Sequence, residues 1–90
     1  MSQNAPINRA LMLVAVYGSP DIRLDQCADL FGMTPTEASR RARVHRLPVP
    51  AFRAGTQKSP WLVSATALAG YLDRQERAAN DAWQKMHDAA

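Results

Sequence analysis

Reactive side chains are scarce in this sequence. Cys27 is the only cysteine among 90 residues, so no intramolecular disulfide can form, and a lone thiol suits a reducing cytoplasm. The two histidines, His45 and His87, fall in separate predicted helices and have no second cysteine to complete a metal site. The four glycines stand singly and form no phosphate-binding loop. We therefore expect neither an enzyme nor a protein with a metal or cofactor.

Long apolar runs are missing too. The longest, near the start of the chain, has about seven residues, whereas a membrane-spanning helix needs about twenty. We predict a core helix from Ile7 to Tyr17, with its broad buried face made by Ile7, Leu11, Leu13, Val14 and Ala15. Gly18 should end it. The lone thiol and the short apolar run predict a cytoplasmic protein with no membrane partner.

Acidic residues are nearly absent between residues 34 and 59. This stretch has one acid, Glu37, although the chain has eight acidic and eleven basic residues in all. Its basic residues are Arg40, Arg41, Arg43, Arg46, Arg53 and Lys58. Such a density of positive charge needs counter-ions, and phosphates are the usual ones.

The same stretch has the signals of a helix followed by a hairpin. Thr34 and Pro35 suit a helix start, and Glu37 could complete a capping box. We predict a helix over residues 35–46, ended by the prolines of Leu47-Pro48-Val49-Pro50. A hairpin over residues 51–63 should follow, with its turn at Gly55-Thr56 and with Phe52 and Trp61 paired against the core.

The preceding residues complete a recognisable arrangement. Residues 25–31 read as a short helix and Gly32-Met33 as a turn, so the helix over 35–46 becomes the second helix of a helix-turn-helix. Residues 22–24 read as an extended piece that could pair with the hairpin. The predicted fold class is mainly α with a small β-hairpin: a winged helix-turn-helix with a long C-terminal helix.

That last helix should run from about Ala65 to His87, capped by Ser64. Leu68, Tyr71 and Leu72 anchor its first half, and its distal apolar stripe consists of Ala79, Ala82, Trp83 and Met86. Either a second copy of the chain covers this stripe, giving a homodimer, or the helix folds back onto the first helix. We accordingly divide the chain into a DNA-binding domain, residues 1–76, and an extension, residues 77–90.

On a helical wheel, Ala38 and Ala42 face inward and Arg40 and Arg43 outward. Arginine gives two parallel donors to guanine, so an outward arginine row suits a major groove. The wheel and the charge pattern assign DNA contacts to Thr36, Ser39, Arg43, His45 and Arg46. The alternatives are an ordinary solvated helix face and, at the hairpin, stacking of Trp61 on a base instead of packing in the core.

Residues 10–76 resemble the pyocin activator (PrtN-type) family of bacterial and prophage transcription regulators. The similarity runs through Tyr17-Gly18, Phe31-Gly32, Glu37-Ala38, Arg40-Arg41-Ala42, Leu47-Pro48-Val49-Pro50, Phe52-Arg53, Gln57-Lys58-Ser59, Leu68-Ala69 and Tyr71-Leu72-Asp73. The resemblance implies an activator of bacteriocin or prophage genes that binds promoter-proximal boxes in double-stranded DNA. It also implies DNA contacts at Arg40, Arg41, Arg53, Gln57 and Lys58. It places the fold near the excisionase and MerR-like winged helices. The expected location is then the bacterial cytoplasm, at the nucleoid, with RNA polymerase as a candidate partner.

We expect Arg40 and Arg43 to read bases, and Arg41, Arg46, Arg53 and Lys58 to bind phosphates. Two other functions stay open at this point. One is an excisionase-like factor that bends DNA. The other is a protein-interaction module that uses the distal stripe and binds no DNA.

Overall fold

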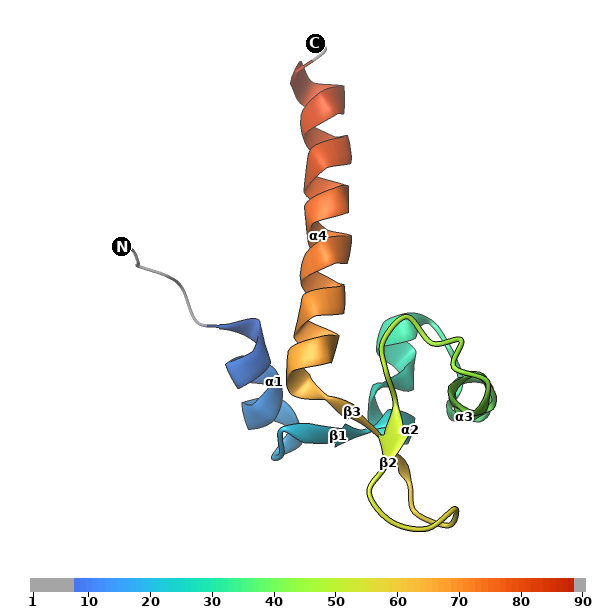
Figure 1. Ribbon diagram of the computed structural model, residues 1–90. Helices are drawn as coiled ribbons and strands as arrows, with labels where there is room; N and C mark the ends of the chain where they lie inside the picture. Colours follow the sequence, from blue (N-terminus) through green and yellow to red (C-terminus); the bar gives the residue numbers. More distant parts are fainter. Residues whose placement is uncertain (1–7, 89–90) are drawn as a thin grey trace.

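The computed structural model describes residues 8–88 of the chain. Its elements follow the order α1 (Arg9–Tyr17), β1 (Asp21–Arg23), α2 (Leu24–Cys27), a 3₁₀ turn η1 (Ala28–Phe31), α3 (Pro35–Arg43), β2 (Phe52–Arg53), β3 (Trp61–Ser64) and α4 (Ala65–Asp88). Figure 1 shows the helices grouped around a small sheet, with α4 rising away from it. The fold is therefore mainly helical with a small antiparallel sheet and a long C-terminal helix.

The sheet joins β1, the segment that follows α1, to the β2–β3 hairpin. Its strand order is β1-β3-β2, and both pairings are antiparallel. In the register Ile22 lies opposite Val63 and Arg23 opposite Leu62, while Phe52 also lies opposite Leu62. The predicted pairing of this extended segment with the hairpin is confirmed for Ile22 and Arg23, whereas Leu24 begins α2.

The core lies where the sheet, α2 and α3 meet the first turns of α4. Its most buried large side chains are Ile22, Leu24, Leu68, Val63 and Cys27. Val49 is also buried, so the segment between α3 and β2 passes back over the core. Ala28, Ala38 and Ala42 complete the contact between α2, η1 and α3, which the small alanine side chain allows to be close.

The predicted buried face of the first helix is wrong at Leu11 and Ala15, although two of its predicted members do pack on the core. Leu11 is 64% exposed and Ala15 is exposed as well, while Leu13, Val14 and Tyr17 pack on the core. The guanidinium of Arg9 bonds Asp73 at 2.6 Å and Glu76 at 2.5 Å, and α4 covers only one side of α1. The helix starts after the Asn8 cap, and Ile7 lies outside the described residues.

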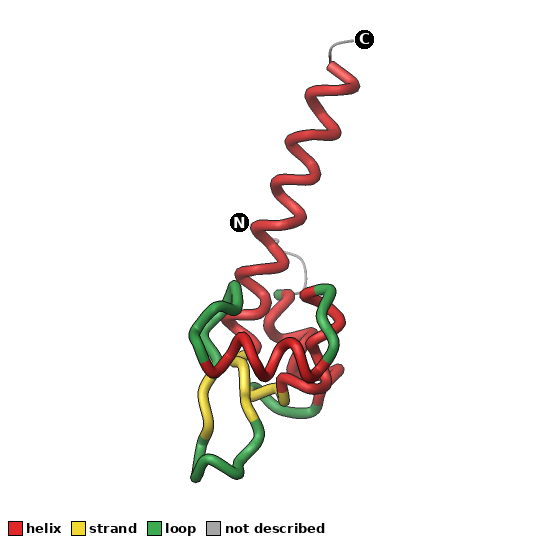
Figure 2. The backbone as a smooth tube through the Cα atoms, turned by 90° about the vertical axis from the view of Figure 1, so that its right-hand side faces the viewer, coloured by secondary structure: helices red, strands yellow, loops and turns green. Residues whose placement is uncertain are grey.

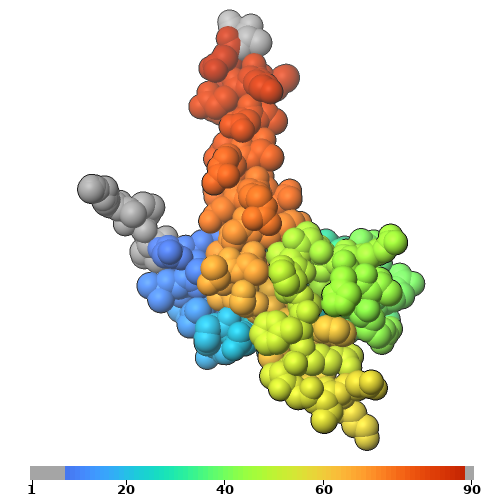
Figure 3. All heavy atoms as spheres, viewed as in Figure 1, coloured from blue at the N-terminus to red at the C-terminus, as the bar shows by residue number. Residues whose placement is uncertain are grey.

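The last helix projects from the fold. Its start is capped as predicted, because the Ser64 hydroxyl accepts a bond from the Ala67 N–H at 3.0 Å. Leu68 and Ala69 are buried, but every residue from Arg74 to Asp88 is exposed. The space-filling view in Figure 3 shows the distal half standing clear of the other described residues. The distal half of α4 therefore does not fold back onto α1, although its proximal half contacts that helix.

Candidate nucleic-acid interface

Helix α3 presents one apolar and one cationic face, as the wheel predicted. Ala38 is 0% exposed and Ala42 is 1% exposed, so the backbone of α3 approaches its neighbours closely. Thr36, Arg40 and Arg43 are exposed on the other side. The Thr34 hydroxyl caps the helix by accepting from the Glu37 N–H at 3.1 Å. The closely packed helix therefore exposes its arginines to solvent.

Glu37 does not use its side chain for a capping box. Its carboxylate bonds Arg40 and accepts from Nε of Arg41 at 2.7 Å. The two arginine side chains remain 67% and 47% exposed, so these are surface ion pairs. Such pairs contribute about 0–1 kcal/mol and can be exchanged for a phosphate at small cost. Among the described residues, Arg43 and Arg46 have no ion-pair partner.

The helix ends three residues before the predicted boundary at Arg46. Val44 is the cap, and His45 has the left-handed backbone angle φ 56°. The His45 N–H bonds the Ala42 carbonyl at 3.1 Å, and the Arg46 N–H bonds the Arg41 carbonyl at 2.9 Å. These are the two bonds of a Schellman ending, which usually has glycine at this position. His45 and Arg46 therefore belong to the helix end, outside its regular turns.

We expect His45→Gly to stabilise the protein by about 0.5–1 kcal/mol, because glycine avoids the clash that a Cβ suffers at positive φ. His45→Ala is the control, since it removes the ring but keeps the Cβ. Urea unfolding of the three proteins measures the difference. If alanine gave the same gain as glycine, the ring and not the backbone would be the cause.

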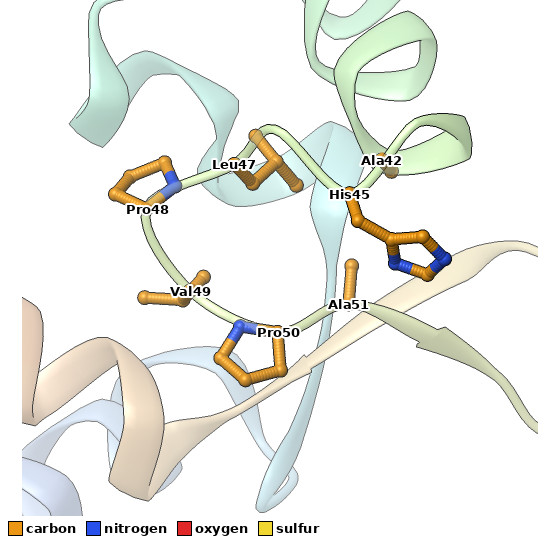
Figure 4. Close-up of a pocket in the computed structure, with 7 residues that line it drawn as sticks. All are labelled: Ala42, His45, Leu47, Pro48, Val49, Pro50 and Ala51. Carbon is orange, nitrogen blue, oxygen red and sulfur yellow. The ribbon is translucent and has the colours of Figure 1, made fainter.

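The loop after α3 forms a shallow hollow over the core. It is lined by Ala42, His45, Leu47, Pro48, Val49, Pro50 and Ala51. Figure 4 shows the prolines on an arc that carries the chain to β2, with the His45 ring extending beside Ala51. Because the imidazole lies at this outer rim, it is accessible from the α3 side of the molecule.

In the hairpin, cationic and aromatic side chains lie together. The guanidinium of Arg53 lies over the Trp61 ring, 4.4 Å from its centroid, and Nη1 donates to the Gln57 carbonyl. Trp61 packs against the core as predicted, but its cross-strand neighbour is Arg53, since Phe52 lies opposite Leu62. The predicted Phe52–Trp61 pair is therefore wrong, because the register sets Phe52 one residue further along β3.

Both of these Arg53 contacts are made within the hairpin. The Arg53 Nε and the Trp61 Nε1 are buried, and neither has a hydrogen-bond partner among the described residues. Lys58 and Gln57, by contrast, are exposed in the loop between the strands. The loop is braced by a bond from the Lys58 N–H to the Thr56 hydroxyl at 3.2 Å. Lys58 is therefore the positively charged side chain that this loop exposes to solvent.

Helix α3 and the hairpin meet at a second hollow. Its lining consists of Arg23, Leu24, Asp25, Ser39, Arg53, Gln57, Lys58, Ser59, Pro60 and Trp61. Figure 2 shows α3 crossing the near face and the hairpin loop projecting beside and below it. The structure therefore brings Ser39 together with Arg53, Gln57 and Lys58, which the sequence had assigned to one surface.

Arg23 was not among the predicted site residues, yet it lines this hollow. It stands in β1 and bonds Asp25, with Nη2 to Oδ2 at 2.8 Å. The signal that could have found it was the extended segment 22–24. The antiparallel register with β3 places Arg23 beside the hairpin, and that register is not readable from the sequence.

Two predicted residues lie on a different side. Arg41 and Arg46 border a groove lined also by Phe31, Met33, Leu47, Pro48 and Tyr71. Phe31 and Tyr71 contact each other there, with ring centroids 5.2 Å apart. The ten predicted residues thus divide into a larger group around α3 and the hairpin and a pair, Arg41 and Arg46, at the groove toward α4.

The lone cysteine lies in the core. Cys27 is 0% exposed, and its burial raises the pKa of the thiol to about 11, so the thiol is protonated at neutral pH and out of reach. Residues 8–88 contain no cluster of three His, Cys, Asp or Glu side chains suited to a metal ion. No helix in the same region combines the length and the apolar character needed to cross a membrane.

Fold and surface together define a small, mainly helical protein whose distinctive chemistry is an exposed cationic face. The family model described as pyocin activator protein PrtN matches residues 10–79, most of the chain, and the chain therefore belongs to this family. The family is regulatory, which indicates a role in pyocin gene activation. The chain matches no curated protein and no solved structure.

Proposed function

We propose that this protein is a winged helix-turn-helix activator that binds double-stranded DNA near pyocin promoters. In this reading α2 with η1 is the first helix of the motif, α3 is the recognition helix and the β2–β3 hairpin is the wing. Residues 1–76 form the DNA-binding domain. The protein acts at the nucleoid, in the cytoplasm, and RNA polymerase is the partner that activation requires.

The observation that carries the proposal is the junction of α3 and the hairpin. Ser39 and Lys58 line one hollow there, although nineteen positions separate them in the sequence. Arg40 and Arg43 are exposed on the same helix. A rigid cationic helix beside a cationic loop matches a major groove and its flanking backbone in shape and charge.

The side chains divide by role. Arg40 and Arg43 are assigned to base edges, with Thr36 and Ser39 serving either a base or a phosphate. Lys58, Gln57 and His45 are assigned to the flanking backbone. Arg53 stabilises the wing through its contact with Trp61. Its positive charge still attracts DNA, but its guanidinium is not free to donate two hydrogen bonds to a base. Arg41 and Arg46, at the groove toward α4, are assigned to phosphates at the edge of the footprint.

Selection of bound sequences from a random DNA pool tests this function. We expect enrichment of a short motif, and a shift of random duplex in a mobility assay at low salt. A protein-interaction module would give neither enrichment nor a shift. An excisionase-like factor would enrich tandem sites and bend them strongly.

Lys58→Ala should weaken binding to specific and random duplexes alike. A phosphate contact carries no sequence information, and its loss removes about 0.9 unit from the slope of log K against log salt. Anisotropy titrations at several salt concentrations measure both effects. Lys85→Ala is the matched control, because Lys85 is exposed on the distal part of α4. Equal slopes for the two variants would remove Lys58 from the interface.

A further inference from the structure

The distal half of α4 has an apolar stripe that nothing in the described chain covers. Trp83 is 56% exposed and Met86 is 75% exposed. At 100° per residue they fall with Ala79 within about 60° of Leu68 and Leu72, which face the core lower down. The stripe thus continues the core-facing side of the helix beyond the point where the core ends.

The other side of the distal half is polar and electrically balanced. Arg77, Asp81, Lys85 and Asp88 lie away from the stripe, and their two positive charges match their two negative ones. A nucleic acid would gain nothing from this neutral segment. A second copy, however, meets no net repulsion there, in contrast to the cationic α3.

Along the stripe, the order of small and large side chains complements that of a second copy running in the opposite direction. In an antiparallel pair Ala79 of one copy lies opposite Met86 of the other, and Ala82 lies opposite Trp83, so small residues face large ones throughout. In a parallel pair Trp83 would face Trp83 and Ala79 would face Ala79, giving crowding in one layer and a gap in the next. Side-chain volume therefore favours the antiparallel arrangement.

We propose that the distal halves of α4 from two copies of this chain pair antiparallel through Ala79, Ala82, Trp83 and Met86. The indole is already ordered for this contact, because the His87 ring stacks on it with centroids 3.7 Å apart. His87 Nδ1 also lies 2.8 Å from the Trp83 carbonyl oxygen. An ordered side chain loses less entropy when it is buried in an interface.

The pair is weak when the protein is free. Four side chains are far fewer than the 20–30 residues a side of a standard interface. With a helical rise of 1.5 Å per residue, the two α4 helices would begin about 50 Å apart, with one DNA-binding domain at each end. The effect of DNA on this pairing rests on the proposed function. Two boxes on one duplex would hold the two copies close together and so strengthen the contact between their α4 helices.

Disulfide trapping without DNA tests the pairing and its direction. Ala79→Cys and Met86→Cys proteins are prepared separately, oxidised mildly alone and as a mixture, and analysed without reductant. Cys27 stays in place because it is fully buried. A cross-linked dimer should form in the mixture and hardly at all in either protein alone, since identical positions lie about 10 Å apart along the antiparallel pair.

The cross-linking results distinguish an antiparallel pair, a parallel pair and a monomer. Cross-linking of each variant with itself would show a parallel pair, and no cross-linking in the mixture would overturn self-pairing. Gln84→Cys, on the polar side, is the control and should remain monomeric. Sedimentation at rising micromolar concentration should also show the average mass increase for the native chain, and Trp83→Ala should abolish the increase. No DNA is present, so these results are independent of whether the chain binds it.

Discussion

Replacing Arg43 with alanine should weaken binding to the selected DNA site by about 1–3 kcal/mol, or about 5–150-fold. Arg43 is exposed on α3 and has no ion-pair partner among the described residues, so its guanidinium is available to a guanine without first leaving an acid. The same change should weaken binding to random duplex much less, because a base contact contributes only where the right base is present.

Arg77→Ala is the matched control for Arg43→Ala. It removes the same side chain from an exposed position on α4, outside the proposed interface. Competition titrations with specific and random duplexes measure all three proteins. Equal losses on both duplexes for Arg43→Ala would reassign Arg43 to the phosphates, and no loss on either would remove α3 from the groove.

Leu68→Ala should destabilise the protein by about 2–5 kcal/mol, the usual cost of emptying a leucine site in a packed core. Leu68 is 0% exposed and belongs to the core cluster with Ile22, Val63 and Ala42. In a domain of this size each kcal/mol lowers the melting temperature by about 4–8 °C. Because the same core supports α3, DNA binding should be lost at temperatures where the native chain still binds.

Leu11→Ala makes the same chemical change on the surface. Leu11 is 64% exposed on α1, so its truncation should alter stability by no more than about 0.5 kcal/mol. Thermal unfolding followed by circular dichroism compares the two variants. A large loss for Leu11→Ala would mean that α1 is covered in solution, as the apolar run in the sequence had suggested.

The elements that local signals fix were predictable. The Thr34-Pro35 start of α3, the Ser64 cap of α4 and the burial of Ala38 and Ala42 depend on residues within a few positions of one another. Helix periodicity and capping chemistry were therefore sufficient for them. The family was also recognisable, because many short signals occur in a fixed order along the chain.

What depended on distant contacts was not predictable. The rotation of α1 depends on its packing against α4, which includes the bonds of Arg9 to Asp73 and Glu76, more than sixty positions away. The early end of α3 is local and was missed for another reason, because it places a histidine in a backbone conformation that sequence patterns assign to glycine. The pairing of the Arg23 segment with the hairpin was predicted, but its register was not. The position of Arg41 and Arg46 away from the hairpin follows from the packing of α4.

The measurement that tests the central claim most directly is a titration of the isotope-labelled chain with a short duplex, followed through its backbone amide resonances. If α3 and the hairpin face DNA, the shifts should concentrate in residues 36–46 and 53–59 and fade as salt is added. The distal residues of α4, 77–88, should be unaffected by a duplex that carries a single box. Unchanged α3 and hairpin resonances at low salt, or shifts confined to α4, would contradict the account.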